Sequence, residues 1–190
     1  MPAAAILLDK KHVTRFRRQL LRWFDREKRS LPWRGTRDPY LILVSEVMLQ
    51  QTRVAVVAER YRGFTTQFPT VERLARAREQ TVLAAWSGLG YYRRARSLHA
   101  AARHIRRAGA FPGSAEELEQ LPGIGRYTAT AVASIAFGEQ VAVVDGNVKR
   151  VLERLLASPG KNKRRPVMRE EQFWQIAQEF LDRRRPGDFN

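Results

Sequence analysis

The sequence predicts an all-α protein. In three segments far apart in the chain, apolar residues recur every three or four positions, which is the spacing of one face of a helix. Residues with this spacing are Phe16, Leu20, Trp23 and Phe24, then Ala95, Leu98, Ala102 and Ile105, and finally Phe173, Ile176, Ala177, Phe180 and Leu181. No convincing run of alternating strand residues accompanies them, although Val141 to Val144 is a candidate short strand.

The first helices have clear boundaries. Residues 31–35, Leu-Pro-Trp-Arg-Gly, end the first helix. Pro39 suits the first turn of a second helix, which we expect to run to about Gln51. Phe68-Pro69-Thr70 starts another element, and the Gly-rich loop 87–90 precedes a basic helix.

The second half of the chain has its own signals. Ser114 to Glu117 has the pattern of a capping box, in which two side chains bind the free N–H groups of a helix start. Leu121 to Gly125 is a tight connection ahead of a helix predicted from about Arg126 to Phe137. Residues 158–166 are predicted to form an exposed basic loop.

The composition favours a polyanionic partner. The 190 residues include 35 Lys and Arg against 19 Asp and Glu, a formal net charge of +16. Solubility alone rarely needs so much charge of one sign, so nucleic acid is the favoured partner. We expect no membrane partner, because the sequence has no long basic amphipathic helix. The sequence contains no cysteine, which excludes disulfides, thiolate metal ligands and cysteine nucleophiles within these residues.

The connection from Leu121 to Gly125 is a candidate phosphate site. Its glycines allow positive φ and close approach of the backbone, and the N–H groups that begin the next helix can face an anion. This is the arrangement of a helix-hairpin-helix, which holds the DNA backbone without reading bases. A plain turn with glycines at helix ends is an equal alternative on the motif alone, and the basic charge favours the DNA interpretation.

Two carboxylates stand in apolar surroundings. Glu46 lies within Leu43 to Leu49, where it either faces solvent or enters a pocket that raises its pKa and makes it a proton donor. Asp145 follows Val141 to Val144, where it either caps the next helix or supplies a negative charge that stabilises a sugar cation. Cleavage of a glycosidic bond uses two carboxylates in different environments.

Five motifs together resemble those of the MutY-type adenine DNA glycosylases, which belong to the helix-hairpin-helix superfamily. In family order they are Leu31-Pro32-Trp33-Arg34, Ser45 to Thr52 (SEVMLQQT), Gly88-Leu89-Gly90-Tyr91-Tyr92, Leu121 to Ala129 (LPGIGRYTA) and Asp145 to Arg150 (DGNVKR). The resemblance implies a helical bundle with a central cleft. It also implies the hydrolytic removal of adenine opposite 8-oxoguanine or guanine in double-stranded DNA.

The same resemblance implies roles for single residues. Glu46 matches the acid that protonates adenine and later handles the water, and Asp145 matches the carboxylate that stabilises the sugar cation. Tyr127 and Asn147 flank that catalytic centre. The substrate-binding positions are Trp33, Arg34, Leu49, Gln51 and Tyr91, of which the last two match side chains that enter the base stack around the lesion. The positions expected at the DNA backbone are Leu121, Gly123, Ile124, Gly125, Arg126 and Lys149.

Tyr127 separates two related chemistries. Endonuclease III-type relatives carry a lysine there, which attacks the sugar and leads to strand cleavage through a Schiff base. Tyrosine cannot form that imine, so we expect a monofunctional glycosylase that uses water. The alternatives are a non-catalytic DNA-binding fragment and a glycosylase/lyase of the endonuclease III type. Lys149 is a candidate to trap the sugar, with a phosphate contact as the favoured role.

The resemblance also implies parts that these residues lack. The family continues with four cysteines that bind a [4Fe-4S] cluster, and with a C-terminal domain that recognises oxoguanine. We expect the cluster only if the natural chain continues past Asn190, and no metal within the chain itself. Residues 1–190 are therefore interpreted as one catalytic region. In it a six-helix core at about 31–145 is joined by an incomplete second lobe at about 1–30 and 146–190. We expect a cytoplasmic, nucleoid-associated monomer.

Overall fold

The computed structural model describes residues 9–156 and 168–190, and within these ranges it is helical without a strand. The all-α prediction is confirmed. The predicted basic loop at 158–166 lies outside the described residues. The helices in chain order are α1 (Lys10–Glu27), α2 (Pro39–Leu49), α3 (Val54–Gln67), α4 (Val71–Arg76), α5 (Glu79–Ala85), α6 (Arg93–Ala108), α7 (Ala115–Glu119), α8 (Arg126–Val132), the π-helical turn η1 (Ala133–Phe137), α9 (Gly146–Leu155), α10 (Glu170–Phe180) and α11 (Pro186–Phe189).

Short polar side chains begin several of these helices. The Asp38 carboxylate accepts hydrogen bonds from the backbone N–H groups of Tyr40 (2.8 Å) and Leu41 (3.2 Å), with Pro39 at the first helical position of α2. The predicted capping box is present at α7, where Ser114 and Glu117 bind each other's backbone N–H groups. Such caps satisfy donors that the helix itself cannot pair, so local sequence alone places these starts.

Two boundaries differ from the prediction. Helix α2 ends at Leu49 rather than at about Gln51, because Gln50 already leaves helical geometry with ψ = 115° and Gln51 has φ = 55°, which a right-handed helix cannot accommodate. The helix predicted from Arg126 to Phe137 is α-helical only to Val132 and finishes as the π-helical turn η1.

The candidate strand at Val141 to Val144 is wrong. The segment is extended but pairs with side-chain amides instead of a neighbouring strand. Gln178 accepts from the N–H of Ala142 at 2.8 Å, and Asn190 accepts from the N–H of Val143 at 3.1 Å. Gln178 also donates to the carbonyl of Gln140, just before the segment, and Asn190 donates to the carbonyl of Val141. These side chains therefore take the place of a neighbouring strand for part of the backbone.

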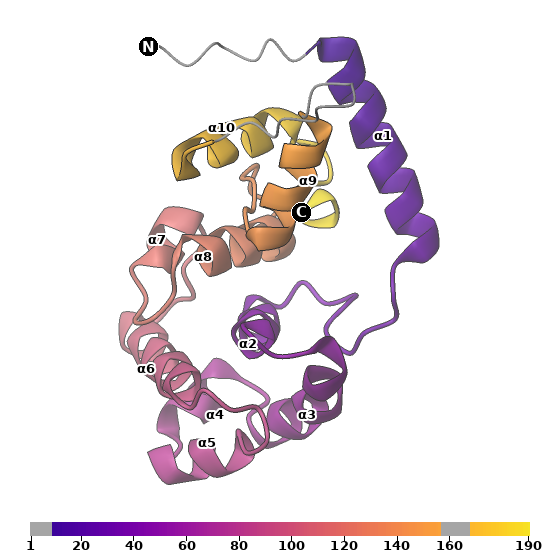
Figure 1. Ribbon diagram of the computed structural model, residues 1–190. Helices are drawn as coiled ribbons and strands as arrows, with labels where there is room; N and C mark the ends of the chain where they lie inside the picture. The colour runs from indigo at the N-terminus through magenta and orange to yellow at the C-terminus, as the bar shows by residue number, and fades with distance from the viewer. Residues whose placement is uncertain (1–8, 157–167) are drawn as a thin grey trace.

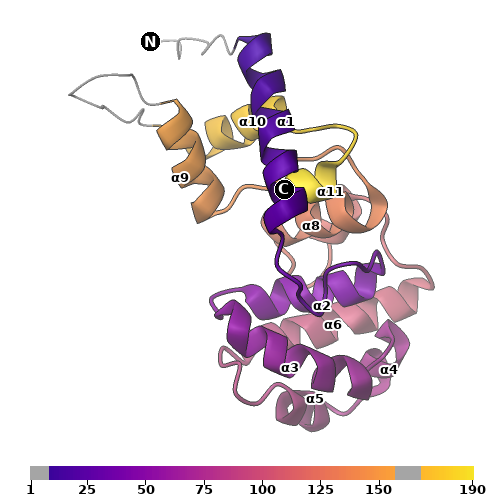
Figure 2. The ribbon, with the colours of Figure 1, turned by 90° about the vertical axis from the view of Figure 1, so that its right-hand side faces the viewer.

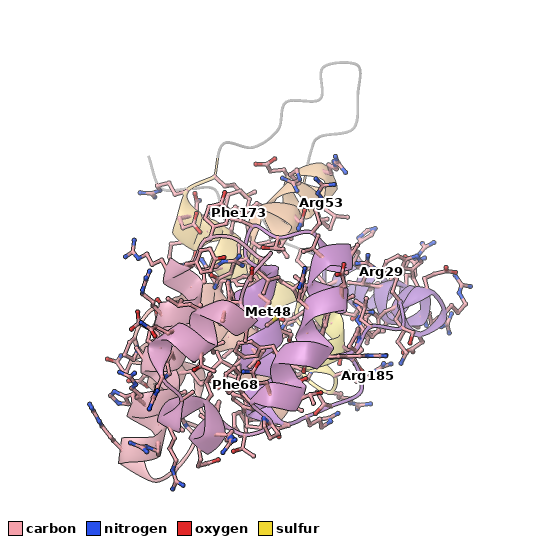
Figure 3. All side chains as sticks on the ribbon, turned by 90° about the horizontal axis from the view of Figure 1, so that it is seen from below. Arg29, Met48, Arg53, Phe68, Phe173 and Arg185 are labelled. Carbon is pink, nitrogen blue, oxygen red and sulfur yellow. The ribbon has the colours of Figure 1, made fainter. Side chains whose placement is uncertain are left out.

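The buried apolar side chains form two hydrophobic clusters, built largely by different helices, which Figures 1 and 2 label. The first is built by α2 to α8 and centres on fully buried side chains such as Met48, labelled in Figure 3, and Trp86. The second joins α1 to the segment before α9 and to α9 and α10, through buried residues that include Val13, Leu152 and Phe180. The division into a core at about 31–145 and a second lobe at about 1–30 and 146–190 stays a proposal. The two clusters support it, but Ala142 and Val144, from the end of the expected core range, belong to the second cluster.

Contacts across nearly the whole chain attach α1 to the C-terminal helices. The guanidinium of Arg17 donates to the carbonyl of Phe180 at 3.0 Å, and the Phe16 ring packs edge-on against the Phe180 ring. Arg185 pairs with Asp25 near the other end of α1. The first and last described segments therefore form one side of the molecule (Figure 2).

Candidate active site

A cleft of about 1030 Å³ separates the two hydrophobic clusters and is lined from both sides. Glu46 and Leu49 of α2 line it from one side, and Asn147 and Leu152 of α9 from the other. Its basic lining residues are Lys28, Arg29, Arg34, Arg37, Arg184 and Arg185, whereas Glu46 and Asp188 are its acidic ones. This excess of positive charge suits a polyanion that approaches the opening.

Glu46 is the acidic residue of α2, and its neighbours in this helix, Ser45 and Val47, are buried. Burial raises the pKa of Glu46 from 4.5 to about 7, because desolvation disfavours the charged carboxylate. The hydroxyl of Tyr127 opposes this shift through a hydrogen-bonding interaction, while the negative charge of Asp145 adds to it. Near neutral pH, Glu46 can therefore both donate and accept a proton.

Tyr127 reaches Glu46 from the first turn of α8. Its pKa is raised, first by burial and then by the charges of Glu46 and Asp145, so the phenol keeps its proton. The two helices are also tied together directly, because the Gln50 side chain at the end of α2 donates to the Thr128 hydroxyl at 3.1 Å. This cross-link fixes the position of Tyr127 relative to Glu46.

Asp145 is the N-cap of α9. One carboxylate oxygen accepts from the backbone N–H groups of Asn147 (2.8 Å) and Val148 (2.7 Å), and the other accepts from the Asn147 side chain at 2.8 Å. The capping interpretation is thus confirmed. A helix start also favours a negative charge, so capping and the stabilisation of a cation are compatible in one residue.

The turn between α7 and α8 has the geometry expected of a phosphate-binding hairpin. Gly123 has φ = 75°, and the N-cap of α8 is Gly125, which has no side chain to cap the helix, so the first N–H groups of α8 are free of side-chain partners. The side chains of Leu121 and Ile124 are buried, with 3% and 4% exposure. They anchor the turn in the core, so only their main chain can contribute to a DNA contact.

Comparison with known proteins agrees with this architecture. Residues 44–178 match the family described as "HhH-GPD superfamily base excision DNA repair protein". The chain belongs to this superfamily. Among curated relatives of this helix-hairpin-helix protein, the adenine DNA glycosylase of Homo sapiens is 48% identical over 96% of the chain, and that of Arabidopsis thaliana is 42% identical over 97%. The chain spans about a third of their lengths, 35% and 33%.

Solved structures of the superfamily share the fold. A thermostable thymine-DNA glycosylase has a TM-score of 0.83 at 28% identity, covering 95% of this chain and 83% of its own. A trapped endonuclease III–DNA covalent intermediate has a TM-score of 0.76 at 22% identity, with 96% and 83% coverage. Both confirm the predicted helical glycosylase fold.

The predicted substrate-binding residues of this superfamily member divide into two groups. Trp33, Arg34 and Leu49 line the cleft beside Glu46. Trp33 is also part of the first hydrophobic cluster and packs edge-on against Tyr61, with ring centroids 5.5 Å apart. The Arg34 guanidinium lies over the ring of Phe24, 5.2 Å from its centroid, and links α1 to the cleft.

Gln51 and Tyr91 form the second group. Neither lines the cleft, and both are exposed, Tyr91 by 62%. In the described ranges they are the two residues other than glycine with positive φ, at 55° and 46°. This backbone strain was not visible in the sequence.

The basic residues expected at the DNA backbone have partners that sequence reasoning missed. Arg126 pairs with Glu171 at 2.9 Å and stacks over Trp174, with the guanidinium carbon 4.0 Å from the ring centroid. Lys149 pairs with Glu170 and lies over Phe173. The four partners all belong to α10. Phosphate groups would therefore compete with glutamates for these two cations.

Proposed function

We propose that this chain is the catalytic region of an adenine DNA glycosylase that hydrolyses the N-glycosidic bond of adenine opposite 8-oxoguanine or guanine. The observation that carries the proposal is the group formed by Glu46, Tyr127 and Asp145, in which burial brings the pKa of Glu46 to about 7. The names of the curated relatives support the choice of adenine.

In the proposed reaction Glu46 is the acid and then the base, and Asp145 stabilises the cation. Protonated Glu46 gives its proton to a ring nitrogen of adenine, and the bond between that base and C1′ of the sugar breaks with its electron pair leaving on adenine. The positive charge that develops on the sugar is stabilised by the carboxylate of Asp145. Ionised Glu46 then takes a proton from the attacking water, whose oxygen bonds to C1′.

The residues present do not fit an iron–sulfur cluster. The sequence contains no cysteine, and within residues 9–156 and 168–190 no three His, Asp or Glu side chains gather as a metal site. No helix of those ranges is long and apolar enough to cross a membrane.

The partner in this proposal is a duplex that contains the mispair, bound by a monomer at chromosomal DNA. The cationic cleft lining and the hairpin at Gly123 support backbone binding. The hydrolytic, monofunctional form of the reaction is supported by Tyr127, and Lys149 is engaged with Glu170 and Phe173 instead of pointing freely toward a sugar.

Glu46→Gln tests the assignment, because the amide has nearly the same shape but cannot donate an acidic proton. Release of free adenine from an A:8-oxoguanine duplex should fall by about 10²-fold or more in single-turnover measurements, with the Kd for the same duplex changed less than about threefold. Adenine release at the normal rate would show that another group is the acid.

The two alternatives give different results in the same assay. Wild-type protein that binds the duplex without releasing adenine would indicate a DNA-binding fragment. A covalent DNA complex trapped in good yield by borohydride would indicate a glycosylase/lyase.

A further inference from the structure

Gln51 and Tyr91 share one partly buried cation. The guanidinium of Arg94 donates to the carbonyl of Gln50, which precedes Gln51, and to the carbonyl of Gly90, which precedes Tyr91. The first bond comes from Nη1 and the second, at 3.2 Å, from Nη2. One planar group therefore holds the two peptides that precede the two strained residues.

The guanidinium has further partners in the last turn of α2 and in the two loops that contain Thr52 and Leu89. Nη1 also donates to the carbonyls of Val47 (3.0 Å) and Met48 (2.8 Å), and Nη2 donates to the Thr52 hydroxyl (2.9 Å) and the Leu89 carbonyl (2.9 Å). The fixed fork of arginine can span both loops at once, which a lysine ammonium cannot.

A simple capping role does not account for this arrangement. The carbonyls of Val47 and Met48 belong to the last turn of α2, and binding them would be ordinary C-terminal capping. Capping does not require contacts to Leu89 and Gly90, which belong to a separate loop further along the chain. The Trp86 indole N–H also donates to the Gly90 carbonyl, at 3.1 Å.

Aromatic rings hold the guanidinium in place. Its central carbon lies 5.5 Å from the ring centroid of Trp86, which is fully buried, and 5.5 Å from that of Tyr91, which is exposed. The exposed ring thus rests on a cation that is itself fixed from the interior. Residues held in rare backbone conformations persist only where their surroundings determine them, and they concentrate at functional sites.

The same helix contacts the phosphate-binding hairpin. Ser97, one turn after Arg94 on α6, packs so closely on Gly123 that a Cβ at Gly123 would lie 2.3 Å from the Ser97 hydroxyl oxygen. Helix α6 therefore fixes Gln51 and Tyr91 relative to the hairpin.

We propose that Arg94 is a positioning residue that sets Gln51 and Tyr91 as one rigid wedge at a fixed distance from the hairpin, so that both side chains enter the duplex together. The inference rests on the proposed function, because it assigns to that function the device that opens the base stack. The hairpin, bound to the DNA backbone, holds the duplex in place while Gln51 and Tyr91 enter it. The target base then leaves the stack toward the cleft.

The test compares Arg94→Lys with the matched control Arg96→Lys. Arg96 lies on the same helix, but it is exposed and pairs with Glu79 at 2.9 Å. Both substitutions keep the charge. The duplex carries 2-aminopurine next to the target adenine, because the fluorescence of this base rises when it is unstacked. Thermal unfolding is measured for each variant.

Wild-type protein and Arg96→Lys should raise the fluorescence equally on binding. Arg94→Lys should give less than about half of that rise and a single-turnover rate of adenine release at least about tenfold lower, with its Kd for undamaged duplex within about threefold of wild type. Thr52→Val, which removes one guanidinium partner, should shift fluorescence and rate in the same direction by a smaller amount, and it serves if Arg94→Lys does not fold.

Three results would overturn the proposal. The first is an equal fluorescence rise for Arg94→Lys and wild type, and the second is no rise with wild type. The third is an equal loss of affinity of Arg94→Lys for damaged and undamaged duplex, because this result would indicate that Arg94 has only a structural role. Adenine release by wild-type protein tests the proposed function separately. If that function is wrong, wild-type protein would raise the fluorescence without releasing adenine.

Discussion

The carboxylate of Glu46 and the hydroxyl of Tyr127 face each other where α2 meets α8, and the charge of Asp145 acts on both. Burial raises the pKa of Glu46 more than the tyrosine hydroxyl lowers it, which brings the value to about 7. This balance places proton donation by Glu46 in the neutral range.

Base release should depend on pH through Glu46. The protonated carboxyl is the active form, so the single-turnover rate should fall as pH rises through about 7. The measurement is adenine release from a duplex saturated with protein, across a pH series on both sides of that value. A rate that stays level or increases over this range would contradict the assignment.

Tyr127→Phe provides a matched variant for the pH profile. It removes the hydroxyl that favours the charged carboxylate but keeps the ring, so the pKa of Glu46 should increase. The fall in rate should then occur at higher pH than in wild type. An unchanged or lower midpoint would show that the hydroxyl does not act on Glu46.

Glu46→Gln should stabilise the fold at alkaline pH. The folded pKa of about 7 exceeds the ordinary value of 4.5, so the folded state binds more protons and loses stability as pH rises from about 4.5 to about 7. Above that range the glutamine variant lacks this penalty and should be more stable by at most about 3 kcal/mol, the free energy that corresponds to this difference in pKa.

Urea denaturation at a pH below about 4.5 and at a pH above about 7 measures this difference. The control is Glu59→Gln, an exposed glutamate on α3, which should change the free energy of unfolding by less than about 0.5 kcal/mol at either pH. A glutamine variant at position 46 that is less stable than wild type at the higher pH would show that the charged carboxylate does not lower the stability of the fold.

Gly123→Ala should destabilise the protein by about 2 kcal/mol or more, because the residue has positive φ and a Cβ would meet Ser97. Gly113→Ala is the control, since that position does not have positive φ and a Cβ there would enter open space. Denaturation midpoints measure both. Equal midpoints for the two variants would show that the hairpin does not need glycine.

Glu171→Gln should tighten DNA binding. It frees Arg126 from an exposed ion pair of the kind that contributes only about 0.2–1 kcal/mol to folding, so a phosphate no longer competes with the carboxylate. We expect a decrease in Kd of about two- to fivefold and a steeper dependence on salt, measured by fluorescence anisotropy. Glu59→Gln makes the same change in net charge, and an equal effect there would exclude a specific role of Arg126.

Local signals in the sequence predict the helices well. Asp38 with Pro39, and Ser114 with Glu117, satisfy backbone groups within a few residues, so their effect does not depend on the rest of the fold. The segment from Val141 to Val144 shows the limit of such reasoning. Its β-branched residues suit a strand, but the partners of its backbone come from Gln178 and Asn190, which only the folded chain brings near.

The candidate site also has features that the sequence predicts and features that only the folded structure reveals. The motifs identify Glu46, Tyr127 and Asp145, but the pKa of Glu46 depends on burial between helices and is visible only in the structure. Arg94 was missed, although the signal was present. It lies four residues before Leu98 and seven before Ala101, on the buried face of α6, where a charged residue is unexpected.

The attachment of α1 to the C-terminal helices affects the order in which the chain can assemble on the ribosome. Asp25 leaves the exit tunnel 160 residues before its partner Arg185, whereas the contacts of α2 to α8 are complete much sooner. We therefore expect α2 to α8 to fold during translation, while the apolar face of α1 stays exposed until the C-terminal helices are synthesised. In a nascent chain arrested before α10, the hairpin between α7 and α8 would be folded, but the cleft would lack the residues that α10 and α11 contribute.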